Sequence, residues 1–414
     1  MQITPVNAGE TAEAYAVDLA DPPVLGQPAR PAEDRGWRRR WTEELSGPVA
    51  WPVAVYVASR LLLLIETAVL ALVAHQPFTQ EPFRFDARWY LLLAQHGYPT
   101  VPLHAKSTLG FFPLYPLVLR GVGWLFMLPV PVAALVTSLI GGLVSAVLVQ
   151  RLATAWWGER AARRVTVVFC LFPGAIVFSM AYSECLTIPL ALGCLLALRS
   201  RRWTLAGLTA GLATAVEPVA VVLIVICLIA AVRELRAAGW RDREALRSLA
   251  APLLAPLGIG ALAVFLWAWT GTPFAVYLAQ HYGWHQQNQP LALAGLPVAR
   301  RILSDTTHLL THFLTWNIVD GVVGAIFLLF SIRQLIRYRR EMSIGALLLP
   351  AGIAAVTLWS ILTPPNARML LIAFPAVMIW GRHLSGRRFA VFASAEVVLL
   401  IFTSALTFSG HMLP

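Results

Sequence analysis

Charged residues are scarce in this chain of 414 residues. Asp, Glu, Lys and Arg together make up 13% of it, whereas about 25% is usual for a soluble globular domain. Hydrophobic residues make up 58%, and the mean hydropathy is +0.68. This composition excludes an ordinary soluble enzyme and indicates a protein that crosses a membrane several times.

The motifs of several large enzyme classes are missing as well. The chain has no Walker P-loop, no G-x-G-x-x-G after a strand pattern, no H-E-x-x-H and no D-x-D in its loops. These absences disfavour primary ATP-driven transport. They also disfavour an enzyme that binds a nucleotide sugar through manganese.

A metal or redox site is not indicated either. The four cysteines lie in or beside apolar segments without C-x-x-C spacing, so we expect them to be small core residues. His281 and His285 are four residues apart, as are His308 and His312, which is the spacing of metal ligands on a helix. No acidic or cysteine ligand accompanies them. We therefore expect no metal and no other cofactor.

The net charge of +11 is distributed in short arginine clusters between apolar segments. With a cytoplasmic N-terminus, 23 of the 32 basic residues fall in inside segments and 6 in outside loops. This bias follows the positive-inside rule, so membrane topology explains the charge and no nucleic-acid partner is expected. Residues 1–45 lack apolar periodicity and predict a disordered cytoplasmic tail. Residues 46–414 predict an integral membrane domain, which in a bacterial-type cell would lie in the plasma membrane.

Apolar segments of suitable length predict an all-α, polytopic bundle with about 11 transmembrane helices, since a span needs roughly 20 apolar residues. The expected spans lie near 50–74, 131–150, 165–181, 185–198, 204–216, 218–232, 250–270, 316–332, 343–362, 368–381 and 389–408. A further apolar piece at 114–128 predicts a juxtamembrane helix on the external side. Within the first span, we expect Glu66 to pair with Arg60.

The most informative stretch is the polar segment at 80–116, which follows the first span. Asp86 lies between Arg84 and Arg88, and Trp89 and Tyr90 follow. A carboxylate, two cations and two aromatic rings at a membrane surface suit a phosphorylated, lipid-linked sugar. We therefore expect catalytic and substrate-binding residues in this stretch.

The run FDARWYLLLAQHGY and the later GFFPLYP resemble the PIG-V-like mannosyltransferases of the GT-C superfamily. Weaker similarity continues in FPGAIVFSMAYSECL, FAVYLAQHYGWHQQ and NARMLLIAFPAV, and the resemblance covers roughly residues 55–380. The chain departs from the family pattern at Phe85, where tryptophan is usual, and at Glu217, where a basic residue is expected. The resemblance implies a GT-C-like fold, a polyprenyl-phosphate-linked mannose donor and catalysis by Asp86. The substrate-binding candidates are Arg84, Arg88, Trp89, Tyr98, Tyr115, Tyr182, Glu184, Gln280, Trp284 and Arg368.

Each charged candidate also has a structural alternative. Asp86 is either the base that accepts the acceptor's proton or the N-cap of the following helix. Arg84 and Arg88 either contact phosphate or pair with Glu81 and Asp86 or with headgroups. Arg368 has no acidic neighbour in sequence and either binds phosphate or anchors its span.

The remaining candidates have structural alternatives too. Glu184 is either functional or a solvated residue at headgroup level, and Glu217 is either functional or a partner of a span arginine such as Arg60. Gln280, Tyr282 and Trp284 form either a sugar-binding wall or part of an interfacial aromatic belt.

The sequence thus favours a membrane glycosyltransferase that moves mannose from a polyprenyl-phosphate carrier to a cell-envelope acceptor on the external face. Its expected partners are the lipid-linked donor and membrane lipids. The alternative is a secondary transporter or lipid-carrier flippase, in which ionisable residues near the bilayer midplane would carry the function. A non-catalytic membrane partner is the third class.

Overall fold

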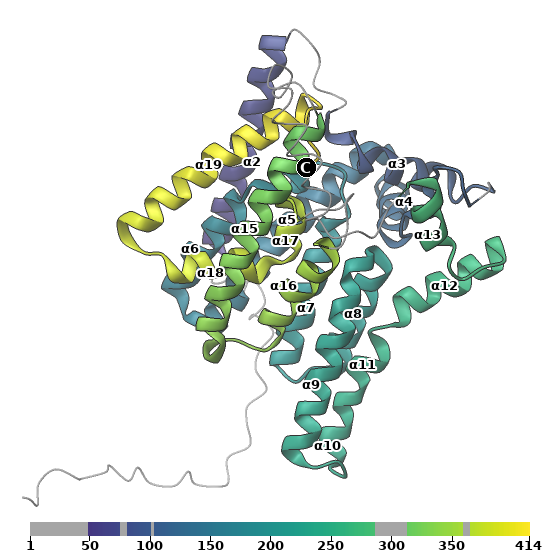
Figure 1. Cartoon of the computed structure of the whole chain (residues 1–414), viewed down its shortest axis with the longest axis vertical. Helices are drawn as coiled ribbons and strands as arrows, with labels where there is room; N and C mark the ends of the chain where they lie inside the picture. The colour runs from purple at the N-terminus through teal and green to yellow at the C-terminus, as the bar shows by residue number, and fades with distance from the viewer. Residues whose placement is uncertain (1–48, 75–80, 101–102, 286–312, 359–364) are drawn as a thin grey trace, which may run out of the picture. The chain divides into compact units, whose positions relative to one another are not determined.

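The computed structural model describes residues 49–74, 81–100, 103–285, 313–358 and 365–414 (Figure 1). The predicted tail at 1–45 and the histidine pair His308 and His312 lie outside the described residues.

Every regular element in these described ranges is helical, and none is a strand. The elements are α-helices joined by short 3₁₀ turns and a single π-helical turn, Ala279–Gly283. Helices satisfy all their backbone hydrogen bonds within one segment, which is why long apolar runs adopt them in lipid. The predicted all-α membrane bundle is confirmed.

Six helices of the described residues are long and apolar enough to cross a membrane, which makes the chain an integral membrane protein. They are Ala50–Val73 in α2, Val130–Trp157 in α5, Pro218–Ala238 in η4 and α9, Arg243–Thr270 in α10 to α12, Val319–Arg337 in α15 and Gly386–Phe408 in α19. The shorter helices around them are α6 (Glu159–Leu171), α7 (Glu184–Arg199), α8 (Trp203–Val216), α16 (Gly345–Thr357), α17 (Ala367–Ile372) and α18 (Phe374–His383).

The expected count of about 11 spans is not confirmed, because several apolar runs form shorter helices than their length suggests. The run at 165–181 divides into α6 and the 3₁₀ segment η3 (Pro173–Ser179), which are bent by 70°. The run at 368–381 divides at Ala373 into α17 and α18. Pro173 and Pro375 stand just inside the second piece of each pair, where a missing N–H is tolerated, whereas within a continuous helix it would break the hydrogen-bond ladder.

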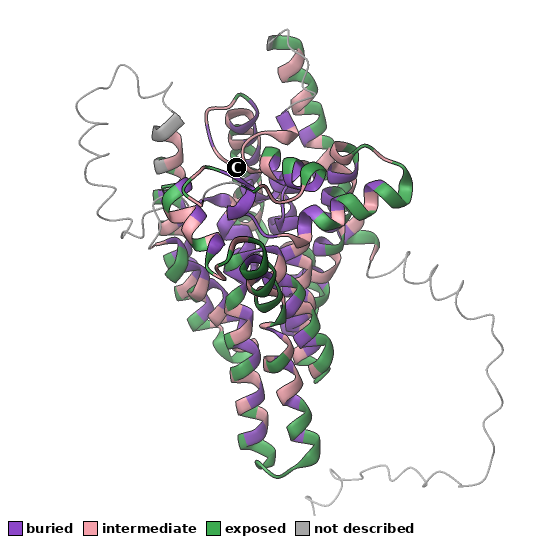
Figure 2. Cartoon of the chain, turned by 90° about the vertical axis from the view of Figure 1, so that its right-hand side faces the viewer, coloured by how far each residue is buried: buried purple, intermediate pink, exposed green. Residues whose placement is uncertain are grey.

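Helix α5 lies at the centre of the packing and contacts α2, α4, α6 and α7. Glycines allow this close approach: a Cβ on Gly141 would lie 2.1 Å from the Cys185 carbonyl oxygen, and one on Gly142 would lie 2.4 Å from the Tyr56 hydroxyl. Small residues bring helices together in this way inside membranes. Figure 2 shows buried residues on the inner faces of the helices and exposed residues on their outer faces.

The polar residues inside the spans are not paired as expected. Arg60 donates to the Ala175 carbonyl and to Ser179 Oγ, both at 2.8 Å. Glu66 instead accepts a hydrogen bond from Ser404. The predicted pair between Arg60 and Glu66 is therefore wrong, because each polar group finds a nearer partner across a helix interface.

Short elements gather beside the spans and carry the aromatic and charged motifs (Figure 1). They are η1 (Glu81–Phe83), α3 (Asp86–His96), η2 (Thr108–Gly110), α4 (Leu114–Phe126), α13 (Ala275–Leu278) and the π-helical turn η6 (Ala279–Gly283). The helix expected at 114–128 is α4, which ends at Phe126; Trp124 in its last turn and Met127 just after it are 84% and 91% exposed.

Candidate functional site

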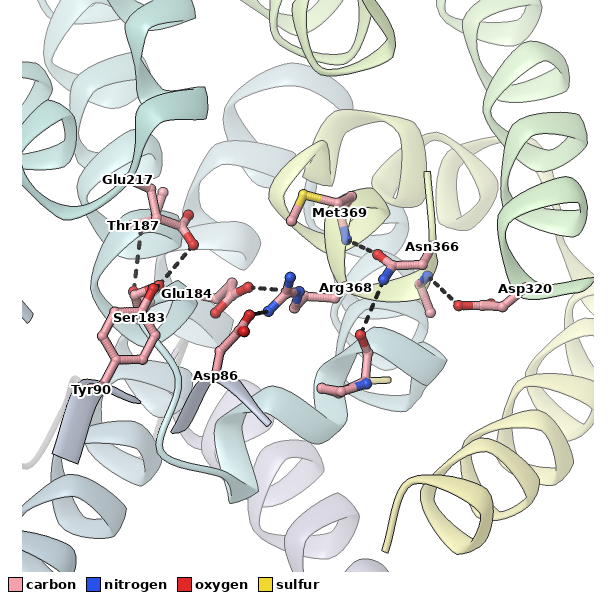
Figure 3. Close-up of polar contacts among 12 residues, drawn as sticks. Asp86, Tyr90, Ser183, Glu184, Thr187, Glu217, Asp320, Asn366, Arg368 and Met369 are labelled. Atoms are coloured by element: carbon pink, nitrogen blue, oxygen red, sulfur yellow. Dashed lines mark hydrogen bonds and ion pairs between the residues drawn. The ribbon is translucent and has the colours of Figure 1, made fainter. Parts of the chain in front are cut away.

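Arg368 is the centre of a charged cluster formed by residues far apart in the sequence (Figure 3). Its Nη1 donates to Asp86 Oδ2 at 2.7 Å, and its Nε lies 3.3 Å from Glu184 Oε1. The guanidinium also lies 5.2 Å from the centre of the Tyr182 ring. The Arg368 side chain is only 12% exposed, so these contacts form with little competition from water.

The turn that carries Arg368 is fixed by its own hydrogen bonds. Asn366 caps α17, since its Oδ1 accepts from the Met369 N–H at 3.0 Å, and its Nδ2 donates to the Pro414 carbonyl at 3.3 Å. Asp320 Oδ2 of α15 accepts from the Ala367 N–H at 3.3 Å. These contacts tie the start of α17 to the C-terminal residues and to α15, so Arg368 is held on an ordered backbone.

Gly174 of η3 packs directly against this turn. A Cβ at Gly174 would lie 2.1 Å from the Ala367 carbonyl oxygen and 3.1 Å from the Arg368 N–H nitrogen. We expect Gly174→Ala to move the start of α17 and to destabilise the protein by roughly 1–3 kcal/mol, measured as a lower Tm in detergent. The matched control is Gly193→Ala, whose added methyl meets Thr209 Cγ2 at an ordinary 3.5 Å. A Gly174→Ala protein with the wild-type Tm would contradict this packing.

Asp86 is the first residue of α3 but does not cap it. The N-cap is Phe85, which has φ +55° and provides no side-chain cap. The structural alternative for Asp86 is therefore wrong: its carboxylate pairs with Arg368 instead of with the backbone of its own helix. The Asp86 side chain is 32% exposed and lines a cavity, so it is available to a ligand.

Two further carboxylates lie beside the pair of Asp86 and Arg368. Glu184 begins α7 and is fully buried, so the expectation of a solvated headgroup-level residue is wrong. Glu217, between α8 and η4, accepts from Ser183 Oγ at 2.7 Å. Its predicted pairing with Arg60 is also wrong. Ser183 Oγ lies 2.8 Å from the Tyr90 hydroxyl, so a short hydrogen-bonded chain links Glu217 to α3.

The cluster holds three carboxylates and one guanidinium. Burial raises the pKa of Glu184, which lies outside the six candidate spans, to about 8; the neighbouring Glu217 raises it further and Arg368 opposes this. The raised pKa favours the protonated form of Glu184, because a fully ionised cluster would leave negative charge in a buried place.

This raised pKa predicts how stability depends on pH. The folded state binds the Glu184 proton more tightly than the unfolded chain, so the contribution of Glu184 to stability is fully present below the ordinary pKa of 4.5 and is lost as the pH rises towards about 8. We expect Glu184→Gln to flatten the fall in Tm between these pH values. Glu244→Gln, at a carboxyl whose side chain is 77% exposed, should leave the slope unchanged. An unchanged slope in Glu184→Gln would contradict the assignment.

A cavity of about 700 Å³ joins this cluster to an apolar wall. Its polar lining includes Asp86, Tyr90, Lys106, Glu217, Gln280, His281, Trp284 and Arg368. Its apolar lining includes Phe112, Val216, Val219, Ile259, Leu262, Ala263, Leu266 and Val356. Four of the apolar residues come from α12, which belongs to a candidate span. The cavity therefore offers a charged end and a surface for an apolar chain.

Aromatic rings form one wall of this cavity. Trp284 lies edge-on to Trp89, with ring centres 4.9 Å apart, and Trp89 stacks on Phe111 at 6.3 Å. Trp284 Nε1 donates to the Ser107 carbonyl at 3.1 Å, and Gln280 Nε2 donates to the Gly110 carbonyl at 2.9 Å. Of the predicted wall residues, Gln280 and Trp284 therefore line the cavity. The side-chain nitrogens Gln280 Nε2 and Trp284 Nε1 are bonded to backbone carbonyls of the protein.

The other predicted substrate-binding residues lie elsewhere. Arg84 pairs with Glu81, the structural alternative weighed for it. Arg88 is exposed, and Trp89 is the ring beside it. Tyr115 and Tyr182 are fully buried, and Tyr98 donates its hydroxyl to the Phe111 carbonyl at 2.7 Å. Three of these residues still contact the cavity or the cluster through their rings: Trp89 meets Trp284, Tyr115 meets Tyr90, and Tyr182 lies under the Arg368 guanidinium.

Two polar residues of the site, Ser183 and Lys106, were not among the predicted site residues. Ser183 gave no signal, because a single hydroxyl beside an apolar helix is common. Lys106 did give one, since it is the only lysine among the 414 residues. This single lysine lies in the cavity lining, which makes it a candidate ligand-binding residue.

Fold and site together define an all-helical integral membrane protein with a charged cluster at one end of a cavity. No protein-family model matches the chain, and no curated protein matches it. It is similar to the apo form of the Archaeoglobus fulgidus oligosaccharyltransferase, with a TM-score of 0.43 and 14% identity over 90% of this chain and 56% of that chain. Another similar structure is AglB from Archaeoglobus fulgidus in complex with an inhibitory peptide and a dolichol-phosphate, with a TM-score of 0.42, 14% identity and coverage of 91% and 56%. The chain spans just over half the length of these neighbours.

Proposed function

We propose that the protein is a membrane glycosyltransferase of the PIG-V-like, GT-C type, which moves mannose from a polyprenyl-phosphate carrier to an acceptor hydroxyl. One observation carries the proposal: a single cavity presents both a carboxylate-rich cluster and an apolar wall contributed by a candidate span. A lipid-linked sugar has the matching parts, since its isoprenoid chain suits the apolar wall and its phosphate and sugar suit the polar end.

In the proposed reaction, the oxygen of the acceptor hydroxyl attacks C1 of the donor sugar. The bond between C1 and the phosphate oxygen breaks, and polyprenyl phosphate leaves with the electron pair. Asp86 takes the proton from the acceptor hydroxyl, which is the work of a general base. Asp86 suits this role because it lines the cavity and its carboxylate is oriented by Arg368.

Arg368 has a double role in this proposal. One of its N–H groups orients Asp86, and Arg368 itself lines the cavity, where a planar guanidinium can also contact the donor phosphate. Trp284 lines the cavity and supplies an aromatic face for a sugar ring, and Trp89 packs edge-on against it. With the about 11 spans expected from the sequence, the segments that bear these residues all fall on the arginine-poor side, and that bias supports an external active site with a cytoplasmic N-terminus.

A secondary transporter or lipid-carrier flippase is the competing proposal, and Glu396 is the observation that favours it. Glu396 lies in the candidate span α19, is 3% exposed, and neither carboxyl oxygen has a hydrogen-bond partner among the described residues. Glu66 and Asp320 also lie within candidate spans. Ionisable residues inside spans are typical of substrate and ion pathways.

The test is transfer by purified protein in detergent. Polyprenyl-phosphate-mannose and polyprenyl-phosphate-glucose are offered with a panel of cell-envelope glycolipids, glycans and peptides, and sugar on the acceptor is measured by mass spectrometry. We expect a mannosylated product and no glucosylated one. Transfer of glucose alone would overturn the mannose assignment. If no acceptor in the panel is modified and the donor stays intact, the proposal that the protein is a glycosyltransferase is overturned.

A further inference from the structure

The cavity contains a second cation whose surroundings differ from those of Arg368. The charge of Arg368 is opposed by Asp86 and Glu184, both within ion-pair distance. Lys106 also lines the cavity, and within the described ranges no carboxylate lies within ion-pair distance of it. Its positive charge is therefore available to a ligand, whereas that of Arg368 is largely balanced by protein.

Lys106 is held over aromatic faces at the cavity wall. Its Nζ lies 4.4 Å from the centre of the Trp284 ring and 6.0 Å from that of Trp89. A cation in such a position is attracted to the ring faces and keeps its three N–H donors free for an anion. The amine is thus placed on the cavity side without being neutralised.

The loop that carries Lys106 is fixed on both sides. Trp284 donates to the Ser107 carbonyl, and Gln280 donates to the Gly110 carbonyl. Gly283 packs on the preceding residue, since a Cβ there would lie 2.5 Å from the Ala105 carbonyl oxygen. Three contacts from one neighbouring element therefore position Lys106, and its backbone has little freedom to withdraw.

The composition of the chain makes this position unusual. Thirty-one of the 32 basic residues are arginines, and the single lysine lies in the cavity. A primary amine is a compact point charge on a flexible stem, whereas a guanidinium is a planar fork that stacks flat on tryptophan. An amine can therefore leave the ring faces to follow an anion.

Charge balance indicates what that anion is. Asp86 and Glu217 line the same cavity, so an anionic ligand needs an unbalanced cation to offset them. We infer that Lys106 is a binding residue for the phosphate ester of the ligand that occupies this cavity. This inference rests on the proposed function, in which the phosphate belongs to the polyprenyl carrier; a phospholipid headgroup offers the same chemistry and is separated by the test.

The test uses the fact that Lys106 is the only side-chain amine. Purified full-length protein in a non-ionic detergent is treated with an amine-acylating reagent, and acylation at Lys106 and at the N-terminal amine is followed by peptide mass spectrometry. Polyprenyl phosphate, phosphatidylglycerol and inorganic phosphate are added separately. Binding of polyprenyl phosphate is measured independently by tryptophan fluorescence or thermal shift.

We expect polyprenyl phosphate to slow acylation of Lys106 at least fivefold relative to the N-terminal amine, and phosphatidylglycerol at the same concentration to have no such effect. Equal protection by phosphatidylglycerol would reassign Lys106 to a headgroup and overturn its donor role. Bound polyprenyl phosphate with no protection would overturn the role of Lys106 and leave the proposed function intact. If polyprenyl phosphate does not bind at all, both the role of Lys106 and the proposed function are overturned.

Variants supply a second measurement. Lys106→Gln should raise KM for the lipid-linked donor about tenfold, the size expected from losing one charge-assisted hydrogen bond. Lys106→Arg keeps the charge but places a guanidinium that stacks flat on tryptophan, so it should restore only part of the affinity. The matched control is Arg120→Gln, which removes an exposed cation of α4 that is not part of the cavity lining. Equal Tm values establish that each variant is folded, and an unchanged donor KM in folded Lys106→Gln would overturn the inference.

Discussion

Asp86→Asn should abolish sugar transfer while leaving the protein folded and in the membrane. Asparagine keeps the size of the side chain and can still accept the hydrogen bond from Arg368 Nη1, which aspartate receives at 2.7 Å. It cannot take a proton from the acceptor hydroxyl. The loss of a general base lowers kcat by about 10²- to 10⁴-fold, so turnover should fall by at least the lower figure.

The matched control for this variant is Asp242→Asn. Asp242 caps α10, where its Oδ1 accepts from the Glu244 N–H at 2.8 Å, and it does not line the cavity. Its substitution should leave kcat unchanged. Unaltered turnover in a folded Asp86→Asn sample would remove Asp86 from the chemistry.

Arg368→Ala should produce the second large effect. The substitution leaves Asp86 without its orienting partner and leaves the buried Glu184 beside Glu217 without the opposing charge. We expect kcat/KM for the donor to fall by about 10²-fold, as for removal of one electrostatic contact in an active site. Arg368→Lys should restore only part of it, because an ammonium cannot reproduce the fork that contacts two carboxylates.

The two substitutions should not be additive. If Arg368 acts by orienting Asp86, the double variant will be little worse than Asp86→Asn alone. The control is Arg382→Ala, which breaks the exposed pair with Glu341, formed at 3.0 and 3.2 Å, and should leave donor kinetics unchanged. An anchoring role for Arg368 predicts less protein in the membrane with normal kcat and KM per folded molecule, and that result would contradict the site.

Hydropathy was sufficient for the fold class but not for the number of spans. Long runs of apolar residues allow only helices in lipid, so the all-α bundle followed directly. The same runs do not show where a helix bends: α6 and η3 together contain enough apolar residues for a span, yet they meet at 70° before Pro173. Composition alone cannot separate a continuous span from two short helices.

The partners within the site were not predictable from sequence. Asp86 and Arg368 are 282 residues apart, and no local pattern relates them. The topology predicted from the sequence places both on one side of the membrane, which allows a contact without identifying it. Glu184 was the harder case, because an acid at the end of an apolar run is normally solvated, whereas here the packing of α7 encloses it. Tertiary packing, not local sequence, decides both features.

The most direct test of the account follows the sugar itself in sealed proteoliposomes. Polyprenyl-phosphate-mannose with a labelled sugar is incorporated in the lipid, an acceptor identified in the panel is supplied, and both the chemical form and the leaflet of the label are measured. The account predicts that the label becomes covalently attached to the acceptor, that polyprenyl phosphate appears in equal amount, and that Asp86→Asn prevents both. Label that stays on the lipid carrier and only changes leaflet, in the wild type and in Asp86→Asn alike, would show a carrier and contradict the account.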